Sequence, residues 1–141
     1  MPTFRAGDSY AIDPAIGRDS APACRTGAPN RVWIAEADDP GGTVYLRPNH
    51  GGGGAHVAHA GFVTAPEARG HGVARVILAR ALAEARAAGF RAMQFNFVVE
   101  TNAAARHLWT TAGFEEVGRL PQAFRHLSKG YVDALVFYRL L

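Results

Sequence analysis

A glycine-bearing turn between an expected strand and an expected helix is the part of the sequence best suited to chemistry. Arg69-Gly70-His71-Gly72 follows a strand that is expected to end at Thr64, and a strongly helical stretch begins at Val73. Glycine lets backbone N–H groups crowd around an anion, and the N-terminus of a helix attracts negative charge. The turn therefore predicts a pyrophosphate-binding loop. The competing interpretation is a plain strand-to-helix turn that uses glycine only for its geometry.

The residues around this turn exclude two common kinds of nucleotide loop. A Walker loop requires Gly-Lys-Ser or Gly-Lys-Thr, and neither sequence is present at this turn. A dinucleotide fingerprint requires a third glycine where this chain has Arg75. It also requires an acidic residue about 20 positions later, where the chain has Phe90-Arg91-Ala92. The turn therefore matches neither a Walker loop nor a dinucleotide-binding loop, and the pyrophosphate expected here belongs to another kind of ligand.

The elements that position the turn are deduced from periodicity and turn signals. Apolar residues at helical spacing predict a helix over 73–88, which Gly89 ends. Apolar residues alternate over an expected strand at 93–99, which places Gln94 and Asn96 on its opposite face. The remaining expected elements are strands at 32–37, 43–46, 56–64, 114–120 and 131–140, and a helix at 102–112. Hairpins combined with one strand–helix–strand crossover predict an α/β fold with a mixed sheet.

Length and composition limit the class of protein. With 141 residues, 48% of them hydrophobic and 19% charged, the chain is expected to form one soluble domain over residues 1–141. No apolar run reaches the roughly 20 residues of a membrane helix, and the N-terminus has no signal-peptide core, so we expect a cytosolic protein without membrane contact. The net charge of +3 comes without a basic stripe, which disfavours nucleic acid. Cys24 is the single cysteine, so we expect no internal disulfide and no metal.

Two motifs in this chain resemble those of the GNAT superfamily of N-acetyltransferases. Arg69-x-x-Gly72-x-Ala74 resembles the family's coenzyme A pyrophosphate motif, and Val63-x-x-Pro66 precedes it. The second motif resembles the family's later helix beside the pantetheine arm, and it is Asn102-x-x-Ala105-x-x-x-Trp109-x-x-x-Gly113-Phe114. The resemblance implies a mixed, mostly antiparallel sheet flanked by helices, with acetyl-CoA as cosubstrate. The cofactor contacts that it implies come from Phe62, Val63, Ala65, Arg69, Gly70, His71, Gly72, Val73, Ala74 and Asn102.

A narrower resemblance is to bacterial and fungal enzymes similar to L-azetidine-2-carboxylate acetyltransferase. The residues that carry it are 56–62, 90–102 and 131–135. It implies acetyl transfer to the amine of a small substrate, with an imino or amino acid as a candidate. Compared with the family, the chain is expected to lack the usual first strand and most of the first helix. The strand at 32–37 would then lie at an unpaired sheet edge, which a second copy could cover in a homodimer.

The resemblance to this branch points to Asn96 and Asn102 as catalytic residues, because amides can orient an amine or hold an oxygen without titrating. Asn102 has a competing role as the N-cap of the helix at 102–112, a role that Thr101 could also fill. His59 replaces the Asn of relatives and is the candidate base, since the pKa of free histidine is about 6.5. Its competing role is that of a hydrogen-bonded structural residue.

Other side chains complete the predicted site. The residues expected to line the acceptor pocket are His59, Phe62, Asn96, Tyr10 and Trp33. For Phe62, Tyr10 and Trp33 a place in the hydrophobic core is an equally good interpretation. Many family members place a tyrosine acid in the later helix, and this chain has Trp109 there. Arg106 could reach the cofactor phosphates, although a solvated helix arginine is the preferred interpretation. Two alternatives remain open: acetylation of a protein or antibiotic amine, and a non-catalytic acyl-CoA-binding module.

Overall fold

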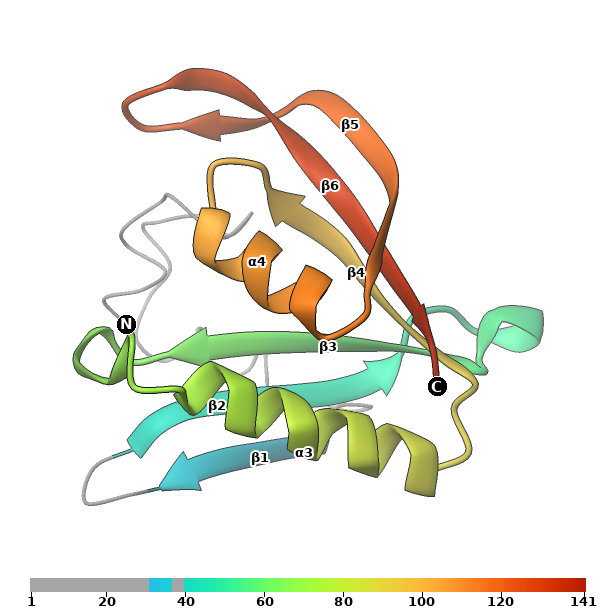
Figure 1. Ribbon diagram of the computed structural model, residues 1–141. Helices are drawn as coiled ribbons and strands as arrows, with labels where there is room; N and C mark the ends of the chain where they lie inside the picture. The colour runs from blue at the N-terminus through green and yellow to red at the C-terminus, as the bar shows by residue number, and fades with distance from the viewer. Residues whose placement is uncertain (1–30, 37–39) are drawn as a thin grey trace, which may run out of the picture. The chain divides into compact units, whose positions relative to one another are not determined.

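The computed structural model describes residues 31–36 and 40–141, with side chains from Gly41 onward. The chain divides into two compact units. The α3 unit comprises the described residues up to Met93 together with Leu140 and Leu141, and the α4 unit comprises Gln94–Arg139. Figure 1 labels the helices and strands of both units.

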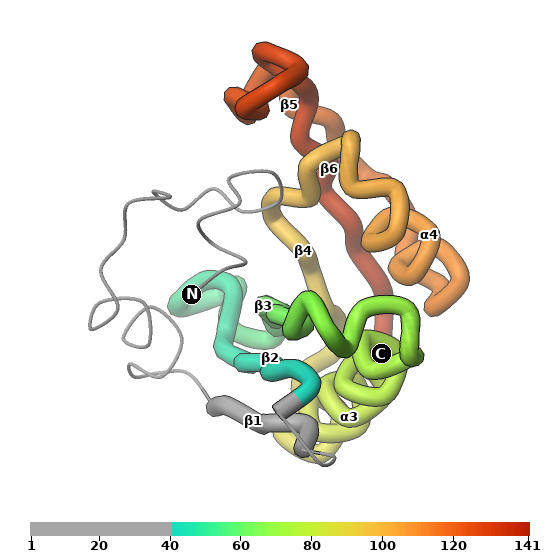
Figure 2. Tube along the Cα trace, turned by 90° about the vertical axis from the view of Figure 1, so that its left-hand side faces the viewer, coloured from blue at the N-terminus to red at the C-terminus, as the bar shows by residue number. Residues whose placement is uncertain are grey.

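Three antiparallel strands form the body of the α3 unit. They are β1 (Arg31–Glu36), β2 (Pro40–Pro48) and β3 (Val57–Thr64), and β2 pairs with both of the others. Two short 3-10 turns, η1 (Gly52–Gly54) and η2 (Pro66–Ala68), precede and follow β3. The helix α3 (Val73–Ala87) runs along one face of β2 and β3 (Figure 1 and Figure 2).

The packing of α3 follows from the periodicity of its sequence. Its buried residues recur at helical spacing, as predicted, and they are Ile77, Leu78, Ala81, Leu82 and Ala85. Val44 and Leu46 of β2 are buried on the sheet face beneath the helix. Gly42 lies on the same face, and a side chain there would come within 3.2 Å of Val73 Cγ1 and 2.9 Å of Val63 O. Glycine at this position therefore lets α3 approach the sheet closely.

The α4 unit combines one helix with β4 (Ala92–Val99), β5 (Glu115–His126) and β6 (Gly130–Leu140), in the spatial order β4-β6-β5. Helix α4 (Ala103–Thr111) packs on β4 through an aromatic cluster. The centroid of the Phe95 ring lies 4.3 Å from that of Trp109 and 4.6 Å from that of Phe114. Each of these side chains is at most 7% exposed, so Trp109 is a core residue of this unit.

The predicted order of elements and the mixed α/β class are confirmed, and two strand lengths are corrected. β2 extends beyond the expected 43–46 because Pro40-Gly41-Gly42, interpreted as a turn, belongs to the strand, where Gly42 serves packing. β5 was expected to end at Leu120 but continues through Pro121 to His126. Proline cannot donate a strand hydrogen bond and is tolerated at a bulge, and the β5–β6 register shifts between Leu120 and Phe124.

Some predictions fall outside the described residues. These are Tyr10, Cys24 and the missing first strand and helix, and Trp33 is described only by its backbone in β1. The single domain over residues 1–141, the cytosolic location and the homodimer stay predictions. Among the described residues, no helix is long and apolar enough to cross a membrane. The same residues contain no group of three or more His, Cys, Asp and Glu side chains that could hold a metal ion.

Candidate functional site

The turn between β3 and α3 presents backbone N–H groups at the start of a helix. Gly70 and Gly72 have φ values of 81° and 78°, a region that favours glycine. Gly72 is the N-cap of α3, so no side chain at this position occupies the N–H groups of the first turn. Within the described part of the chain, no acceptor takes the backbone N–H of Gly70, Gly72, Val73 or Ala74. Because Arg69–Gly72 is exposed, these donors and the helix dipole can act together on an anion.

Charged and polar side chains project from the same turn. Arg69 and His71 are exposed, and neither side chain has a hydrogen-bond or ion-pair partner among the residues described. The turn itself is held in place by backbone bonds, since the Ala65 N–H donates to Gly41 O at 3.0 Å. The arrangement fits a ligand that carries phosphates, with Arg69 as an exposed cation and the helix N-terminus as the backbone donor group.

His59 lies in a polar cluster on the face of β2 and β3 that is opposite α3. Its Nε2 forms a 3.2 Å hydrogen bond with Tyr45 Oη, and the two ring centroids are 5.8 Å apart. Tyr45 lies opposite Gly61, where a side chain would come within 2.5 Å of the Tyr45 Cζ atom, so the glycine makes room for the ring. Arg47 is the cross-strand neighbour of His59 and therefore shares this face. Tyr45, Arg47 and His59 are called the Tyr45 cluster below.

Tyr45 and Arg47 were not predicted as site residues, and His59 was grouped with Phe62, which lies on the other face of β3. Phe62 was expected to line the acceptor pocket with His59, but it pairs with Val44 and leaves β3 toward α3. The alternation of Tyr45 and Arg47 with buried Val44 and Leu46 was a signal that the two polar side chains share a face. The strand register was still needed to place them beside His59.

Asn96 lies on β4 in the α4 unit, on the face predicted for it. Its Oδ1 accepts a 3.0 Å hydrogen bond from Gln94 Nε2, so the two amides share a face, and both side chains are half-buried. The neighbouring Phe95 enters the aromatic core on the other face. The interaction with Gln94 fixes the orientation of the Asn96 carboxamide, which an amide needs if it is to hold a substrate.

Asn102 is the N-cap of α4, which confirms one of its two predicted roles. Its Oδ1 accepts the N–H of Ala105 at 3.1 Å. The preferred interpretation of Arg106 as a solvated helix arginine is wrong. Its side chain is half-buried, and its Nη1 donates to Glu100 O at 3.3 Å. A role of Asn102 toward the cofactor stays a prediction.

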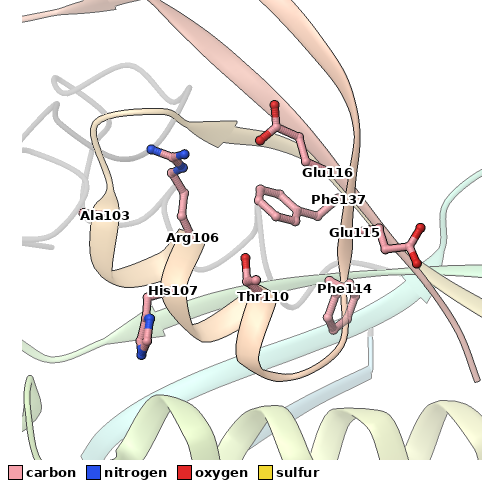
Figure 3. A pocket seen from close by; sticks show the side chains of 8 residues that line it. All are labelled: Ala103, Arg106, His107, Thr110, Phe114, Glu115, Glu116 and Phe137. Carbon is pink, nitrogen blue, oxygen red and sulfur yellow. The ribbon is translucent and has the colours of Figure 1, made fainter.

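An open depression of about 610 Å³ lies on the α4 unit beside Arg106. Figure 3 shows the side chains of α4, β5 and β6 that line it. The lining residues are Ala103, Arg106, His107, Thr110, Phe114, Glu115, Glu116 and Phe137. It carries both acidic and basic groups, and its lining includes Arg106, which was considered for the cofactor phosphates, and Phe114 of the second family motif.

A network of exposed charges joins the end of β4 to β5 and β6. Arg119 contacts carboxylate oxygens of Glu100 at 2.6 Å, Asp133 at 2.9 Å and Glu116 at 3.4 Å. The pKa of Asp133 is lowered, first by the N–H of Gln122 that it accepts and then by the hydrogen bond from Arg119. The pKa of Arg119 is raised, with the Asp133 hydrogen bond as the largest cause. Gln122 lies in the β5 bulge and has a φ of 52°. Its N–H donates to Asp133 Oδ1 at 2.9 Å, and this hydrogen bond stabilises the bulge.

An exposed glycine turn that leads into a helix without a side-chain cap, in a mixed α/β fold, is compatible with a phosphate-bearing ligand. Comparison with known proteins identifies the class of protein. The model of the Acetyltransferase (GNAT) family matches residues 6–114. N-acetyltransferase aca1 from Schizosaccharomyces pombe is 33% identical over 97 residues, which are 68% of this chain and 46% of that protein. The chain therefore spans less than half the length of this curated relative.

Solved structures agree with the family match. A GCN5-related N-acetyltransferase from Kribbella flavida is 41% identical, with a TM-score of 0.91 over 99% of this chain and 89% of that chain. A phosphinothricin acetyltransferase from Sinorhizobium meliloti, solved in complex with acetyl-CoA, is 20% identical with a TM-score of 0.74, over 87% of this chain and 67% of that chain. This second similarity concerns the fold alone. The chain belongs to the Acetyltransferase (GNAT) family.

Proposed function

We propose that this protein is an acetyl-CoA-dependent N-acetyltransferase that acts on the amine of a small molecule, with amino or imino acids such as azetidine-2-carboxylate as the first candidates. The observation that carries the proposal is the exposed turn at Arg69–Gly72, whose backbone N–H groups at Gly70, Gly72, Val73 and Ala74 have no acceptor among the described residues. Family membership supports the choice of coenzyme A over other phosphate-bearing ligands.

The turn would hold the pyrophosphate of the cofactor. Its backbone donors and the α3 dipole favour negative charge, and Arg69 adds a charge-assisted hydrogen bond. The backbone of β3 from Phe62 to Ala65 leads toward this turn and is proposed to run beside the pantetheine arm, as in the family. Acetyl-CoA supplies a reactive thioester carbonyl when it is bound.

The acceptor amine must be neutral before it can attack. In the transfer, the amine nitrogen forms a bond to the carbonyl carbon, the carbon–sulfur bond breaks, and the thiolate of coenzyme A leaves and takes up a proton. His59 is proposed to remove the proton from the ammonium, with Tyr45 holding its ring through the 3.2 Å hydrogen bond. Asn96 is proposed to bind the acceptor through its amide, oriented by Gln94. Asn102 is proposed to add a cofactor contact to its role as a cap.

Binding of acetyl-CoA is the first test, and Arg69→Ala is the variant that addresses the turn. We expect a dissociation constant about tenfold higher or more, because a hydrogen bond to a charged group contributes roughly 1.5–3 kcal/mol. Arg86→Ala is the matched control, since it removes the same charge from an exposed position in the last turn of α3. Isothermal titration calorimetry on the three proteins gives the comparison. Equal affinity for wild type and Arg69→Ala would refute this assignment of the turn.

Turnover is the second test and separates an enzyme from a binding module. Release of coenzyme A thiol is followed with a panel of amino acids, imino acids, lysine peptides and aminoglycosides as acceptors. We expect Asn96→Ala to abolish turnover and to leave acetyl-CoA affinity unchanged. A variant that keeps full activity would remove Asn96 from the site. Acetyl-CoA binding without turnover of any acceptor would favour the acyl-CoA-binding module.

A further inference from the structure

Arg47 on β2 is a half-buried cation for which the described residues provide no counter-charge. Its Nε atom is buried, and neither this atom nor the rest of the guanidinium has a hydrogen-bond or ion-pair partner among the described residues. Arginine carries five N–H donors and stays charged, and buried donors are almost always satisfied. A cation left in this state therefore indicates an anionic ligand.

The surroundings of Arg47 suit a small ligand with a basic centre. In the β2–β3 register, Arg47 pairs with His59 and Tyr45 pairs with Gly61, so the Tyr45 cluster forms one continuous polar strip. The Tyr45 ring packs over Gly61, and its hydroxyl holds His59 Nε2 at 3.2 Å. The opposite face of the same strands is apolar and covered by α3. The strip thus places one cation directly beside the proposed base.

The phosphates of coenzyme A do not account for the missing anion. Their proposed cradle begins after Thr64, whereas the cross-strand partner of Arg47 is His59, five residues earlier on β3. At roughly 3.3 Å per residue this separation is about 17 Å, which is farther than one side chain reaches. The second substrate is the other ligand that the proposed reaction requires, so an anionic group on it can supply a partner for Arg47.

We propose that Arg47 binds the carboxylate of the acceptor, so that the acceptor is an α-amino or α-imino acid rather than an amine without a neighbouring acid group. This inference rests on the proposed function and names the substrate class of its acceptor site. The planar guanidinium matches a carboxylate with two parallel hydrogen bonds. In such an acceptor the amine is one carbon away from the carboxylate, which brings it next to His59. A lysine side chain or an aminoglycoside carries no carboxylate at that distance.

Paired acceptors test the inference: L-azetidine-2-carboxylate against azetidine, and L-proline against pyrrolidine. The proteins are wild type, Arg47→Gln, Arg47→Lys and the control Arg125→Gln, which changes an exposed arginine of β5. We expect wild type to prefer the carboxylated member of each pair by roughly tenfold or more in kcat/KM. Arg47→Gln should raise KM for the carboxylated member by a similar factor and leave the neutral member and the acetyl-CoA affinity unchanged. Arg47→Lys should recover part of the loss, because it keeps the charge without the fork.

Binding of L-proline, measured by calorimetry in the presence of acetyl-CoA, distinguishes the failure of this inference from that of the proposed function. Arg47-dependent binding without any turnover would support the inference and refute the proposed function. Acetylation of both pair members with equal efficiency by wild type and Arg47→Gln would refute the inference and leave the function standing. A wild type that neither binds nor acetylates the carboxylated amines would also overturn it. The inference would also be overturned if Arg47→Gln lowered the melting temperature and reduced kcat/KM equally for the carboxylated and the neutral acceptor. That result would indicate a structural role for Arg47.

Discussion

Replacement of Asn102 can separate the two roles of this residue, because its side chain makes a defined structural bond at the start of α4. The Oδ1 atom accepts the N–H of Ala105 at 3.1 Å. Asn102→Ala removes that acceptor and leaves one more N–H of the first turn unsatisfied. Loss of such a cap costs about 1 kcal/mol, within a range of about 0.5–2 kcal/mol. For a chain of this length the melting temperature should fall by about 3–5 °C.

The comparison variants are Asn102→Ser and Asn102→Asp, since both side chains can accept the same hydrogen bond. Asn102→Asp also places a negative charge at the helix N-terminus, which is favourable. Both should melt within about 1 °C of wild type by circular dichroism. If the amide also contacts the cofactor, both variants should still lose kcat/KM and acetyl-CoA affinity. In that case stability and activity separate.

Two results would refute this reasoning. If Asn102→Ala melts like wild type, the observed bond contributes nothing to stability and the N-cap argument is wrong. If Asn102→Ser and Asn102→Asp keep full activity, the residue acts as a cap alone and its proposed cofactor contact is wrong.

Two further predictions concern the charge network and the Tyr45 cluster. The folded-state pKa of Asp133 is lowered, so its contribution to stability is complete above the unfolded pKa of about 3.9 and is lost as the pH falls through the folded value. Melting temperatures measured between pH 2 and 7 should therefore fall more steeply below about pH 4 for wild type than for Asp133→Asn, and parallel curves would contradict this. In Gly61→Ala the new methyl group would come within 2.5 Å of Tyr45 Cζ, so the ring must move and its hydrogen bond to His59 should break. We expect urea titration to show that Gly61→Ala lowers the free energy of unfolding by about 1–3 kcal/mol. The same substitution should lower it by less in a Tyr45→Ala background. An equal loss in both backgrounds would show that the clash with Tyr45 is not the cause.

Features encoded within a few residues were predictable from the sequence. The glycines at 70 and 72 and the helical pattern after them located the exposed turn and α3. The alternation along β4 placed Gln94 and Asn96 on one face, and their hydrogen bond confirms it. Trp109 was identified as a departure from the family's tyrosine, although its packing against Phe95 and Phe114 was not foreseen. Two motifs in the right order were enough to predict the family that the comparisons show.

Features that depend on which segments meet were not predictable. Gly42 was interpreted as part of a turn because its real partner, Val73, lies on a helix 31 positions later. The expected strand at 114–120 stopped before Pro121, but a bulge opposite β6 accommodates this proline, and Asp133 accepts the Gln122 N–H there. The four-membered charge network around Arg119 likewise joins residues that only strand pairing brings together.

The sequence by itself determined the order of the elements, the position of the exposed glycine turn and the family, because helical and strand periods, glycine conformations and short motifs are local properties. Only the tertiary structure decided that Arg47 and Tyr45 lie beside His59 while Phe62 lies on the other side of the same strand. The physical reason is the two-residue period of a β-strand. A shift of one residue in the pairing of β2 with β3 would exchange their faces, so no motif within a single strand fixes which side chains of the two strands meet.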